Sequence, residues 1–111
     1  MNIQIFGKSK CFDTKKAERY FKERGIRVQS VDLVRFGISR GELTQVRAAL
    51  GSAEALTDFG QPEAALIRYL SREEDKLEKL LENPRLLRTP IVRNGRQATV
   101  GFCPEVWKAW E

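Results

Sequence analysis

Two alternating segments enclose a helical one at the start of the chain. Residues 2–6 and 26–31 alternate polar and apolar side chains, which is typical of strands with one buried face. The segment 13–24 between them has an apolar stripe at helical spacing and is followed by Gly25, a frequent helix stop. This stripe consists of Ala17, Tyr20 and Phe21. The pattern predicts a β-α-β unit.

The middle of the chain carries start signals for three helices. Ser39 and Ser71 each precede a glutamate by three residues, which gives the spacing of a capping box with Glu42 and Glu74. Pro62 suits the first position of the helix between them. Each helix has an apolar stripe that we expect to pack into the core: Leu43, Val46 and Leu50; Leu66, Ile67 and Leu70; and Leu77, Leu80 and Leu81.

Strand patterns return near the C-terminus. Residues 90–93 and 96–102 flank the pair Asn94-Gly95. Such a pair between two strand-like segments predicts a β-hairpin with a type I′ turn.

A last helix follows the predicted hairpin. Pro104 suits its first position, which places Cys103 at the N-cap. We expect its apolar face to hold Val106, Trp107 and Trp110. The order of elements predicts a single α/β domain over residues 1–111, built on a mixed sheet.

The composition is that of a soluble globular protein, with 41% hydrophobic and 32% charged residues. No apolar run approaches the roughly 20 residues that a membrane span requires, and the N-terminus lacks the features of a signal peptide. Two cysteines without an export signal favour a reducing, cytoplasmic location. In that location a cysteine is more often a free thiol or a redox site than a structural disulfide.

The net charge of +5 and the absence of histidine narrow the chemistry. Basic residues are interspersed with acidic ones, as in the run 72–76, which is typical of a solvated helix face and does not favour direct nucleic-acid binding. Without histidine, two cysteines cannot complete a zinc site, and the chain has no glycine-rich phosphate loop. We therefore expect no metal and no bound cofactor.

Cys11 is the best candidate for a reactive residue. It lies between the first predicted strand and the first predicted helix, close in sequence to Lys8, Lys10 and Lys15. The thiolate is the reactive form of cysteine, and a helix N-terminus with cationic neighbours lowers a thiol pKa from about 8.5 to roughly 3.5–7.5. A nearby carboxylate such as Asp13 acts in the opposite direction. The alternative is an inert thiol buried at a strand end.

Four motifs in the same order resemble the small arsenate reductase family, which includes Spx-type and YffB-type proteins. Residues 11–17 are similar to the family's cysteine loop, and residues 66–68 to the segment with an active-site arginine. Residues 89–92 are similar to a strand led by a cis proline, and residues 101–106 to the entry into the last helix. This resemblance implies a thioredoxin-like fold with a mixed sheet and a helical subdomain inserted at approximately residues 38–83.

The chain departs from the arsenate reductases at two of the three arginines that surround their nucleophile. Only Arg68 matches, because Thr89 and Cys103 occupy the other two positions. Arg88 lies one residue before Thr89, and alternation along a strand would turn it to the opposite face. The loss of two bidentate oxyanion donors argues against efficient arsenate reduction.

The resemblance also implies roles for individual residues. Cys11 would be the nucleophile, with its thiolate stabilised by Thr14, Lys15 and the helix N-terminus. Arg68 would stabilise the bound anion, although a solvated helix residue is an equal alternative. Pro90 would form one wall of the groove that receives a thiol substrate.

Cys103 has two interpretations. By the resemblance it would face Cys11 and act as a possible resolving thiol. Thioredoxins and some Spx-type proteins carry their resolving thiol in a Cys-x-x-Cys motif, and in this chain Thr14 occupies the position of its second cysteine. The alternative is a small hydrophobic residue at the start of a helix.

These roles imply a thiol-disulfide oxidoreductase that uses Cys11 and is coupled to glutathione, glutaredoxin or a protein disulfide. Two alternatives stay open. One is a redox-sensing regulator of the Spx type, which would bind RNA polymerase. The other is a true arsenate reductase.

Overall fold

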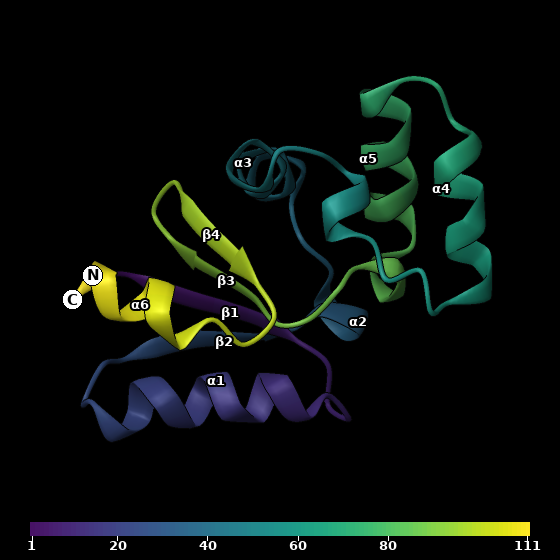
Figure 1. Cartoon of the computed structure of the whole chain (residues 1–111). Helices are drawn as coiled ribbons and strands as arrows, with labels where there is room; N and C mark the ends of the chain where they lie inside the picture. Colours follow the sequence, from purple (N-terminus) through teal and green to yellow (C-terminus); the bar gives the residue numbers. More distant parts are fainter.

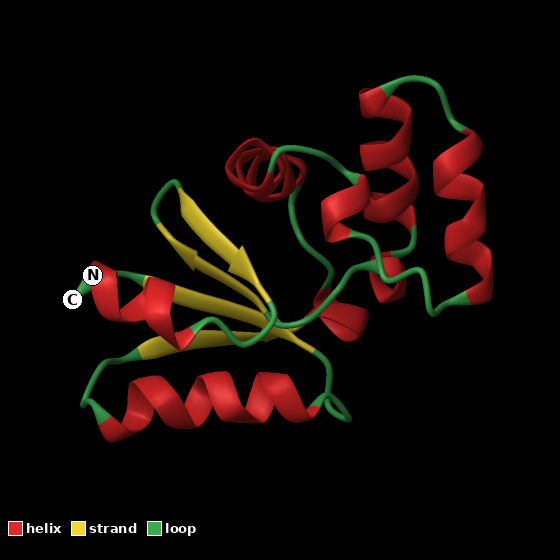
Figure 2. Ribbon diagram, viewed as in Figure 1, coloured by secondary structure: helices red, strands yellow, loops and turns green.

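A mixed four-stranded sheet forms the centre of the protein, whose computed structural model describes all 111 residues (Figure 1, Figure 2). The β-α-β unit is present as β1 (Ile3–Gly7), α1 (Phe12–Glu23) and β2 (Val28–Asp32), and its two strands are parallel. The hairpin of β3 (Ile91–Asn94) and β4 (Gln97–Val100) pairs with the other edge of β1 in antiparallel orientation. The resulting order β2-β1-β3-β4 confirms the expected α/β class with a mixed sheet.

Different helices cover the two faces of the sheet, because successive residues of a strand point to opposite faces. Ile5 and Val92 pack with α1 and the closing helix α6 (Pro104–Trp110) in a cluster that contains the fully buried Trp107. The indole of Trp107 donates a hydrogen bond of 2.8 Å to the hydroxyl of Thr99. Three aromatic rings surround it at centroid separations of 5.2 to 5.4 Å: Tyr20, Phe21 and Phe102.

The other face of the sheet carries the helical segment between β2 and β3 (Figure 1). Its helices are α2 (Leu33–Phe36), α3 (Arg40–Leu50), α4 (Ala65–Tyr69) and α5 (Glu73–Glu82), with 3₁₀ turns at Glu54–Leu56, Pro62–Ala64 and Pro84–Leu86. Helix α3 packs against β4, and α4 and α5 extend away from the sheet at the end opposite α6 (Figure 1). Phe6, Ile91 and Val100 share one buried cluster with this segment, so the segment and the sheet have a continuous core.

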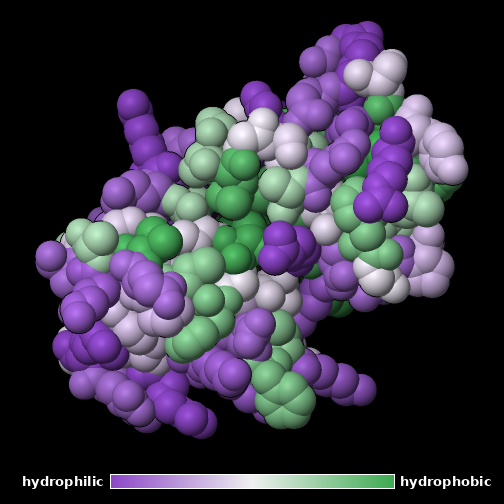
Figure 3. Space-filling view, viewed as in Figure 1, coloured by the Kyte–Doolittle hydropathy of each residue, from purple (hydrophilic) through white to green (hydrophobic).

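Apolar residues gather along the middle of the face in Figure 3, over the hairpin and towards the helical segment. Polar side chains cover both ends of that face. No helix of the protein is long and apolar enough to cross a bilayer.

A short ladder joins the beginning and the end of the helical segment beside the sheet. Thr57 and Leu87 form an antiparallel bridge. Main-chain hydrogen bonds of 2.7 and 2.8 Å flank this bridge and link residues 56–58 to residues 86–88. The ladder therefore holds Asp58 next to residues 86–88, shortly before β3 begins.

The start signal of α3 is confirmed in detail. The Ser39 hydroxyl accepts a hydrogen bond of 3.1 Å from the Glu42 N–H, and the Glu42 carboxylate accepts one of 3.0 Å from the Ser39 N–H. The predicted N-cap position of Cys103 on α6 is also confirmed, and Cys11, expected near the start of the first helix, is the N-cap of α1.

The second predicted capping box is wrong. Helix α5 has Arg72 rather than Ser71 at its N-cap, and no side chain caps it. The carboxylate of Glu74 pairs with the Arg72 guanidinium instead of reaching back to Ser71. Three acidic residues in the first turn supply the charge that a helix N-terminus favours: Glu73, Glu74 and Asp75.

The hairpin is present, but its predicted turn type is wrong. Asn94 pairs with Gln97 across the hairpin and with Ile3 of β1, so it belongs to the sheet and the two-residue loop is Gly95-Arg96. The dihedral angle φ is positive at Gly95 (61°). It is not positive at Arg96, because only glycines of this chain have a positive φ. A type I′ turn needs positive φ at both loop residues, whereas a type II′ turn needs it only at the first.

Two residues of the predicted apolar stripes are exposed. Leu66 is 54% and Val106 is 44% exposed, whereas their neighbours Ile67 and Trp107 are fully buried. Both residues lie on short helices of five and seven residues, which bury only a narrow face.

Candidate active site around Cys11

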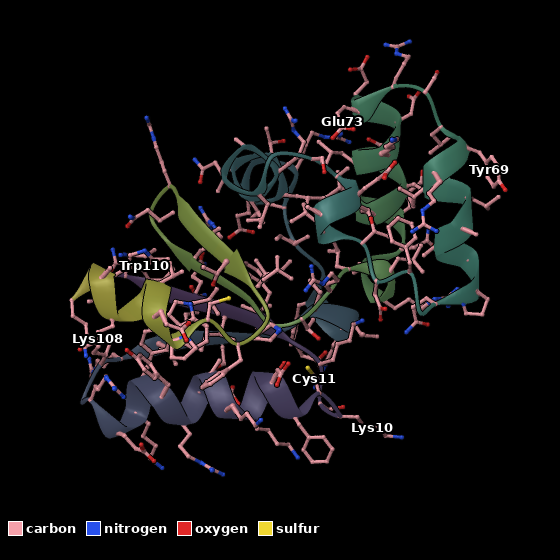
Figure 4. All side chains as sticks on the ribbon, in the orientation of Figure 1. Lys10, Cys11, Tyr69, Glu73, Lys108 and Trp110 are labelled. Atoms are coloured by element: carbon pink, nitrogen blue, oxygen red, sulfur yellow. The ribbon has the colours of Figure 1, made fainter.

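The loop between β1 and α1 places Cys11 at the first turn of α1 (Figure 4). The N–H of Cys11 donates a hydrogen bond of 3.0 Å to the carbonyl of Lys8, which closes a turn. The backbone of Cys11 is extended, with φ of −89° and ψ of 114°, as expected at an N-cap. The side chain is therefore held at the end of α1 where main-chain N–H groups are free.

The sulfur of Cys11 lies against the segment that leads into β3. Its thiol donates a hydrogen bond to the main-chain carbonyl of Thr89, with a sulfur–oxygen distance of 3.6 Å. The Thr89–Pro90 peptide bond is cis, as the resemblance implied. Pro90 is buried, and its carbonyl accepts a hydrogen bond of 2.9 Å from the N–H of Gly101. The loop after β1 and the entry to β3 thus meet at the thiol.

Thr14 supplies a hydroxyl beside the thiol. The side chain is only 7% exposed and packs on Gly7. Its Oγ1 atom makes no hydrogen bond while Cys11 is a thiol. A buried hydroxyl without a partner costs free energy, and a thiolate at Cys11 would give it an acceptor.

The surroundings of Cys11 favour its thiolate overall. Partial burial by itself raises the pKa of the thiol, but hydrogen bonds outweigh burial and the pKa is lowered from its ordinary value. The donors are the hydroxyl of Thr14, the hydroxyl of Thr89 and the main-chain N–H groups of Thr14 and Asp13. The main-chain N–H groups at the start of α1 and the hydroxyl of Thr14 thus favour the ionised, reactive form of Cys11.

Cys11 opens into a hollow of about 420 Å³ with mixed charge. Its wall contains three cationic side chains and two anionic ones. The lining residues are Lys8, Lys10, Cys11, Asp13, Asp58, Gln61, Arg88, Thr89 and Gly101. Figure 4 shows Lys10 extending outward from the loop. The hollow is therefore suited to a small ligand that carries charges of both signs.

The expectation that Arg88 turns away from the nucleophile is wrong. Arg88 lines the Cys11 hollow, and its guanidinium donates a hydrogen bond of 3.2 Å to the carbonyl of Ala55. Alternation along a strand does not apply to it, because β3 begins only at Ile91 and residues 88–90 form an irregular lead-in. The site thus contains an arginine, although not at the position the family motif uses.

Arg68 and Lys15 lie outside the Cys11 hollow. The Arg68 guanidinium stacks on the ring of Phe59, 3.7 Å from its centroid. The Lys15 ammonium lies 6.0 Å from the centroid of the Phe12 ring and borders a different depression, beside Glu18 and Asp32. The structure brings neither residue into contact with the thiol, and their expected roles stay predictions.

Cys103 has a different environment from Cys11. Its thiol donates to the carbonyl of Val100 with a sulfur–oxygen distance of 3.4 Å, and its side chain packs against the cluster around Trp107. Burial raises the pKa of the Cys103 thiol, and the charges of Glu105 and Asp13 add to that rise against the lowering effects of Thr99 and Arg88. Both cysteines are free thiols.

Two residues of the site were missed by the sequence reasoning. Asp58 and Gln61 reach the hollow from the loop that follows the first 3₁₀ turn of the helical segment. The only local signal is the Asp58-Phe59-Gly60 turn, and nothing in that signal predicts the ladder to residues 86–88 that brings it to Cys11. No three acidic or cysteine side chains lie together as a group that could hold a metal ion.

The sheet order, the cysteine at the start of α1 and the cis proline before β3 define a thioredoxin-like protein. The family model described as "ArsC family" matches residues 6–110, and the chain belongs to this family. This assignment confirms the resemblance that the four motifs indicated.

Known proteins similar to this chain fall into more than one class. The chain is 29% identical over 108 residues to global transcriptional regulator Spx 2 of Oceanobacillus iheyensis, over 92% of this chain and 78% of that protein. A solved YffB protein superposes with a TM-score of 0.83 at 21% identity over 97% of both chains. The arsenate reductase from Vibrio cholerae superposes with a TM-score of 0.82 at 23% identity over 96% of this chain and 94% of that one. The proteins similar to this chain thus include an arsenate reductase and a transcriptional regulator.

Proposed function

We propose that the protein is a thiol-disulfide oxidoreductase in which Cys11 is the nucleophile. The observation that carries this proposal is the place of the Cys11 sulfur: at the N-cap of α1, 3.6 Å from the Thr89 carbonyl and beside the unpartnered hydroxyl of Thr14. Hydrogen bonds from Thr14, Thr89 and Asp13 lower the pKa of the thiol there. Membership of the ArsC family supports it. The cis Thr89–Pro90 segment against the sulfur provides the wall along which a substrate backbone would lie.

The proposed reaction is a pair of exchanges. The Cys11 thiolate attacks one sulfur of a disulfide, a bond forms between the two, and the other sulfur leaves as a thiolate that takes a proton from water. A second thiol then attacks the mixed disulfide and restores the Cys11 thiolate. In sum, one substrate sulfur leaves as a thiol and the other is passed to the attacking thiol as a mixed disulfide. A second external thiol then exchanges with that mixed disulfide, which completes the reduction of the substrate and oxidises the two external thiols to a disulfide.

Glutathione is the co-substrate that we propose for this exchange. It is a small peptide with two carboxylates and one ammonium group, and the hollow beside Cys11 offers Lys8, Lys10 and Arg88 together with Asp13 and Asp58. A protein such as glutaredoxin, which exchanges with a glutathione adduct, would complete the cycle. The reducing conditions of the cytoplasm are the setting we propose for it.

The test is adduct formation under mild oxidation. Glutathione disulfide is added to the wild type, Cys11→Ser and Cys103→Ser, and intact mass and peptide mapping locate the adduct. We expect one glutathione on Cys11 in the wild type and in Cys103→Ser, and none in Cys11→Ser. An adduct absent from all three proteins would refute the proposal. A Cys11–Cys103 disulfide in place of the adduct would assign Cys103 the resolving role.

A redox-sensing regulator is the second candidate function. The similarity to Spx 2 favours it, whereas Thr14 in place of the second cysteine of a Cys-x-x-Cys counts against it. Binding to purified bacterial RNA polymerase, with no exchange activity, would reverse the order of the two proposals.

Arsenate reduction is the third candidate function. The presence of Arg88 in the hollow restores one of the missing cationic groups, but Asp58 and Asp13 oppose an oxyanion there. Glutaredoxin-dependent turnover of arsenate by the purified protein would establish it.

A further inference from the structure

Lys8 is tied to the helical segment on one side and to Cys11 on the other. Its ammonium donates a hydrogen bond of 2.7 Å to the carbonyl of Arg85, in the 3₁₀ turn that ends the helical segment. Its own carbonyl accepts the hydrogen bond of 3.0 Å from the Cys11 N–H. The side chain is half-buried in the wall of the hollow that Cys11 and Asp58 also line. An exposed lysine would have no such fixed position.

Asp58 is held firmly on the same hollow. Its carboxylate accepts hydrogen bonds of 2.9 Å from the N–H of Gly60 and 3.5 Å from the side-chain amide of Gln61. Its own N–H donates one of 2.7 Å to the carbonyl of Leu86, as part of the ladder. The helical segment thus contributes a fixed carboxylate to the hollow that Lys8 lines, and a carbonyl that accepts a hydrogen bond from the Lys8 ammonium.

The charges of the three groups are coupled. Burial lowers the pKa of Lys8, whereas the carboxylate of Asp58 and then the thiolate of Cys11 raise it. Coupling between two ionisations is reciprocal, so a thiolate that favours the ammonium form of Lys8 is itself favoured by that ammonium. This effect on the pKa of Cys11 is smaller than that of the hydrogen bonds from Thr14, Thr89 and Asp13. Asp58 alone would repel the thiolate, and it favours the thiolate only by supporting the positive charge of Lys8.

We propose that Lys8 is the positioning residue through which the helical segment sets the ionisation of Cys11. The carbonyl of Arg85 holds the ammonium at the hollow, the carboxylate of Asp58 on the same wall favours its charged form, and the ammonium stabilises the thiolate. This inference rests on Cys11 as the reactive residue of the proposed function. It assigns the insertion a direct effect on the chemistry, in addition to its packing on the sheet.

Other charged groups face the same loop and enter any measured titration. On the side of the hollow they are Lys10, Asp13 and Arg88, and on the side of the neighbouring depression, which Lys8 also lines, they are Lys15, Glu18 and Asp32. A matched comparison is therefore needed to isolate Lys8. Lys10 provides it, because it carries the same charge on the same loop but is exposed.

The first experiment compares Lys8→Met with Lys10→Met by thiolate absorbance against pH, in a Cys103→Ser background. We expect Lys8→Met to raise the pKa of Cys11 by about half a unit or more and Lys10→Met to raise it by less. Below that pKa, the alkylation rate by iodoacetamide should fall by about threefold in Lys8→Met, in line with the smaller thiolate fraction. Lys8→Arg keeps the charge and can donate to the Arg85 carbonyl. It should therefore keep the pKa of Cys11 and the alkylation rate close to their wild-type values.

The second experiment is a double-mutant cycle with Asp58→Asn. In the Lys8→Met background, Asp58→Asn only removes a repulsive charge and should lower the pKa of Cys11. In the presence of Lys8, the same change also removes a charge that favours the ammonium form of Lys8, so the decrease should be smaller or reversed. Equal effects in both backgrounds would show that Asp58 acts on Cys11 without Lys8 and would overturn the inference.

Two further outcomes would also overturn it: an effect of Lys8→Met no larger than that of Lys10→Met, or the same effect in Lys8→Arg as in Lys8→Met. Thermal melts of each variant separate these outcomes from a loss of folding. The readout needs no substrate. If Cys11 forms no glutathione adduct, the proposed function fails while the dependence of its ionisation on Lys8 is still measured.

Discussion

The thiol of Cys11 and the main-chain carbonyl of Thr89 lie 3.6 Å apart, although 78 positions separate them in the sequence. A carbonyl accepts the thiol proton and therefore favours the thiol. The groups that favour the thiolate come mainly from the first turn of α1, where Thr14 and Asp13 present donors to the sulfur. Ionisation thus exchanges one hydrogen bond to the entry of β3 for several from the helix, and the pKa of Cys11 depends on both sides of the site.

Replacement of Thr14 by valine should raise the pKa of Cys11. Valine keeps the shape of the buried side chain but removes the hydroxyl, and a hydrogen bond to a charged group is worth about 1.5–3 kcal/mol, or roughly one to two pKa units. Thiolate absorbance against pH measures the change. Thr44→Val is the control, because Thr44 lies on the exposed side of α3 and bonds only the carbonyl of Arg40. An unchanged pKa in Thr14→Val would mean that the hydroxyl has no part in thiolate stabilisation.

A methyl group at Gly7 should displace the hydroxyl of Thr14. A Cβ atom built on Gly7 would lie 2.2 Å from Cγ2 and 2.8 Å from Oγ1 of Thr14, both far inside contact distance. Gly7→Ala should therefore lower the free energy of unfolding by about 1–3 kcal/mol, as overpacking does, and raise the pKa of Cys11 by displacing Thr14. Chemical denaturation and thiolate titration measure the two effects.

The combination with Thr14→Ala tests the cause. Removal of Cγ2 and Oγ1 relieves the clash, so the loss of stability on Gly7→Ala should be smaller in the Thr14→Ala background. Gly41→Ala is a matched control, since a Cβ atom there meets nothing within 4 Å. Equal losses from Gly7→Ala in both backgrounds would show that Thr14 is not the group that the methyl displaces.

Local patterns predicted the elements of the fold well because each pattern reflects a local interaction. The Ser39–Glu42 capping box and the proline at the start of α6 are satisfied within a few residues, and both are confirmed. The Ser71 capping box does not form because the carboxylate of Glu74 accepts a hydrogen bond from the guanidinium of Arg72. The turn type failed because pairing with β1 keeps Asn94 in the sheet.

The candidate site was less predictable because long-range contacts assemble half of it. Cys11 and Thr14 belong to one short motif, and the sequence indicates both. Asp58 and Arg88 reach the hollow beside Cys11 only through the ladder between residues 56–58 and 86–88, which no local pattern encodes. Arg68 is different, since a motif match assigns it to the site, its guanidinium stacks on Phe59, and its role stays a prediction.

The two cysteines should differ sharply in reactivity. The pKa of Cys11 is lowered and that of Cys103 is raised, so at neutral pH Cys11 holds the larger thiolate fraction. We expect iodoacetamide to modify Cys11 first, by at least about tenfold in rate if the two pKa values differ by a unit or more. Rates for Cys11→Ser and Cys103→Ser, measured between pH 6 and 9, give each thiol separately. The preference should diminish at high pH, where both thiols ionise, and a faster reaction at Cys103 would contradict it.

The capping box of α3 should make the stability of the protein depend on pH in the acidic range. Burial by itself raises the pKa of Glu42, but hydrogen bonds from the Ser39 N–H and hydroxyl and from Gln4, with the charge of Arg93, lower it overall. A carboxylate with a lowered pKa in the folded state stabilises the protein above its unfolded-state pKa. That contribution is lost as the pH falls through the folded-state value.

Urea denaturation of the wild type and Glu42→Gln from pH 7 down to pH 3 tests this. Glutamine keeps the capping geometry without the charge, so the variant should be less stable at pH 7, and the difference should shrink as the pH falls. Ser39→Ala removes the other half of the box and should cost about 1 kcal/mol at neutral pH. Glu82→Gln, an exposed glutamate at the end of α5, is the control for a general charge effect. A stability difference for Glu42→Gln that stays constant with pH would show that the charge of the Glu42 carboxylate does not contribute to the stability.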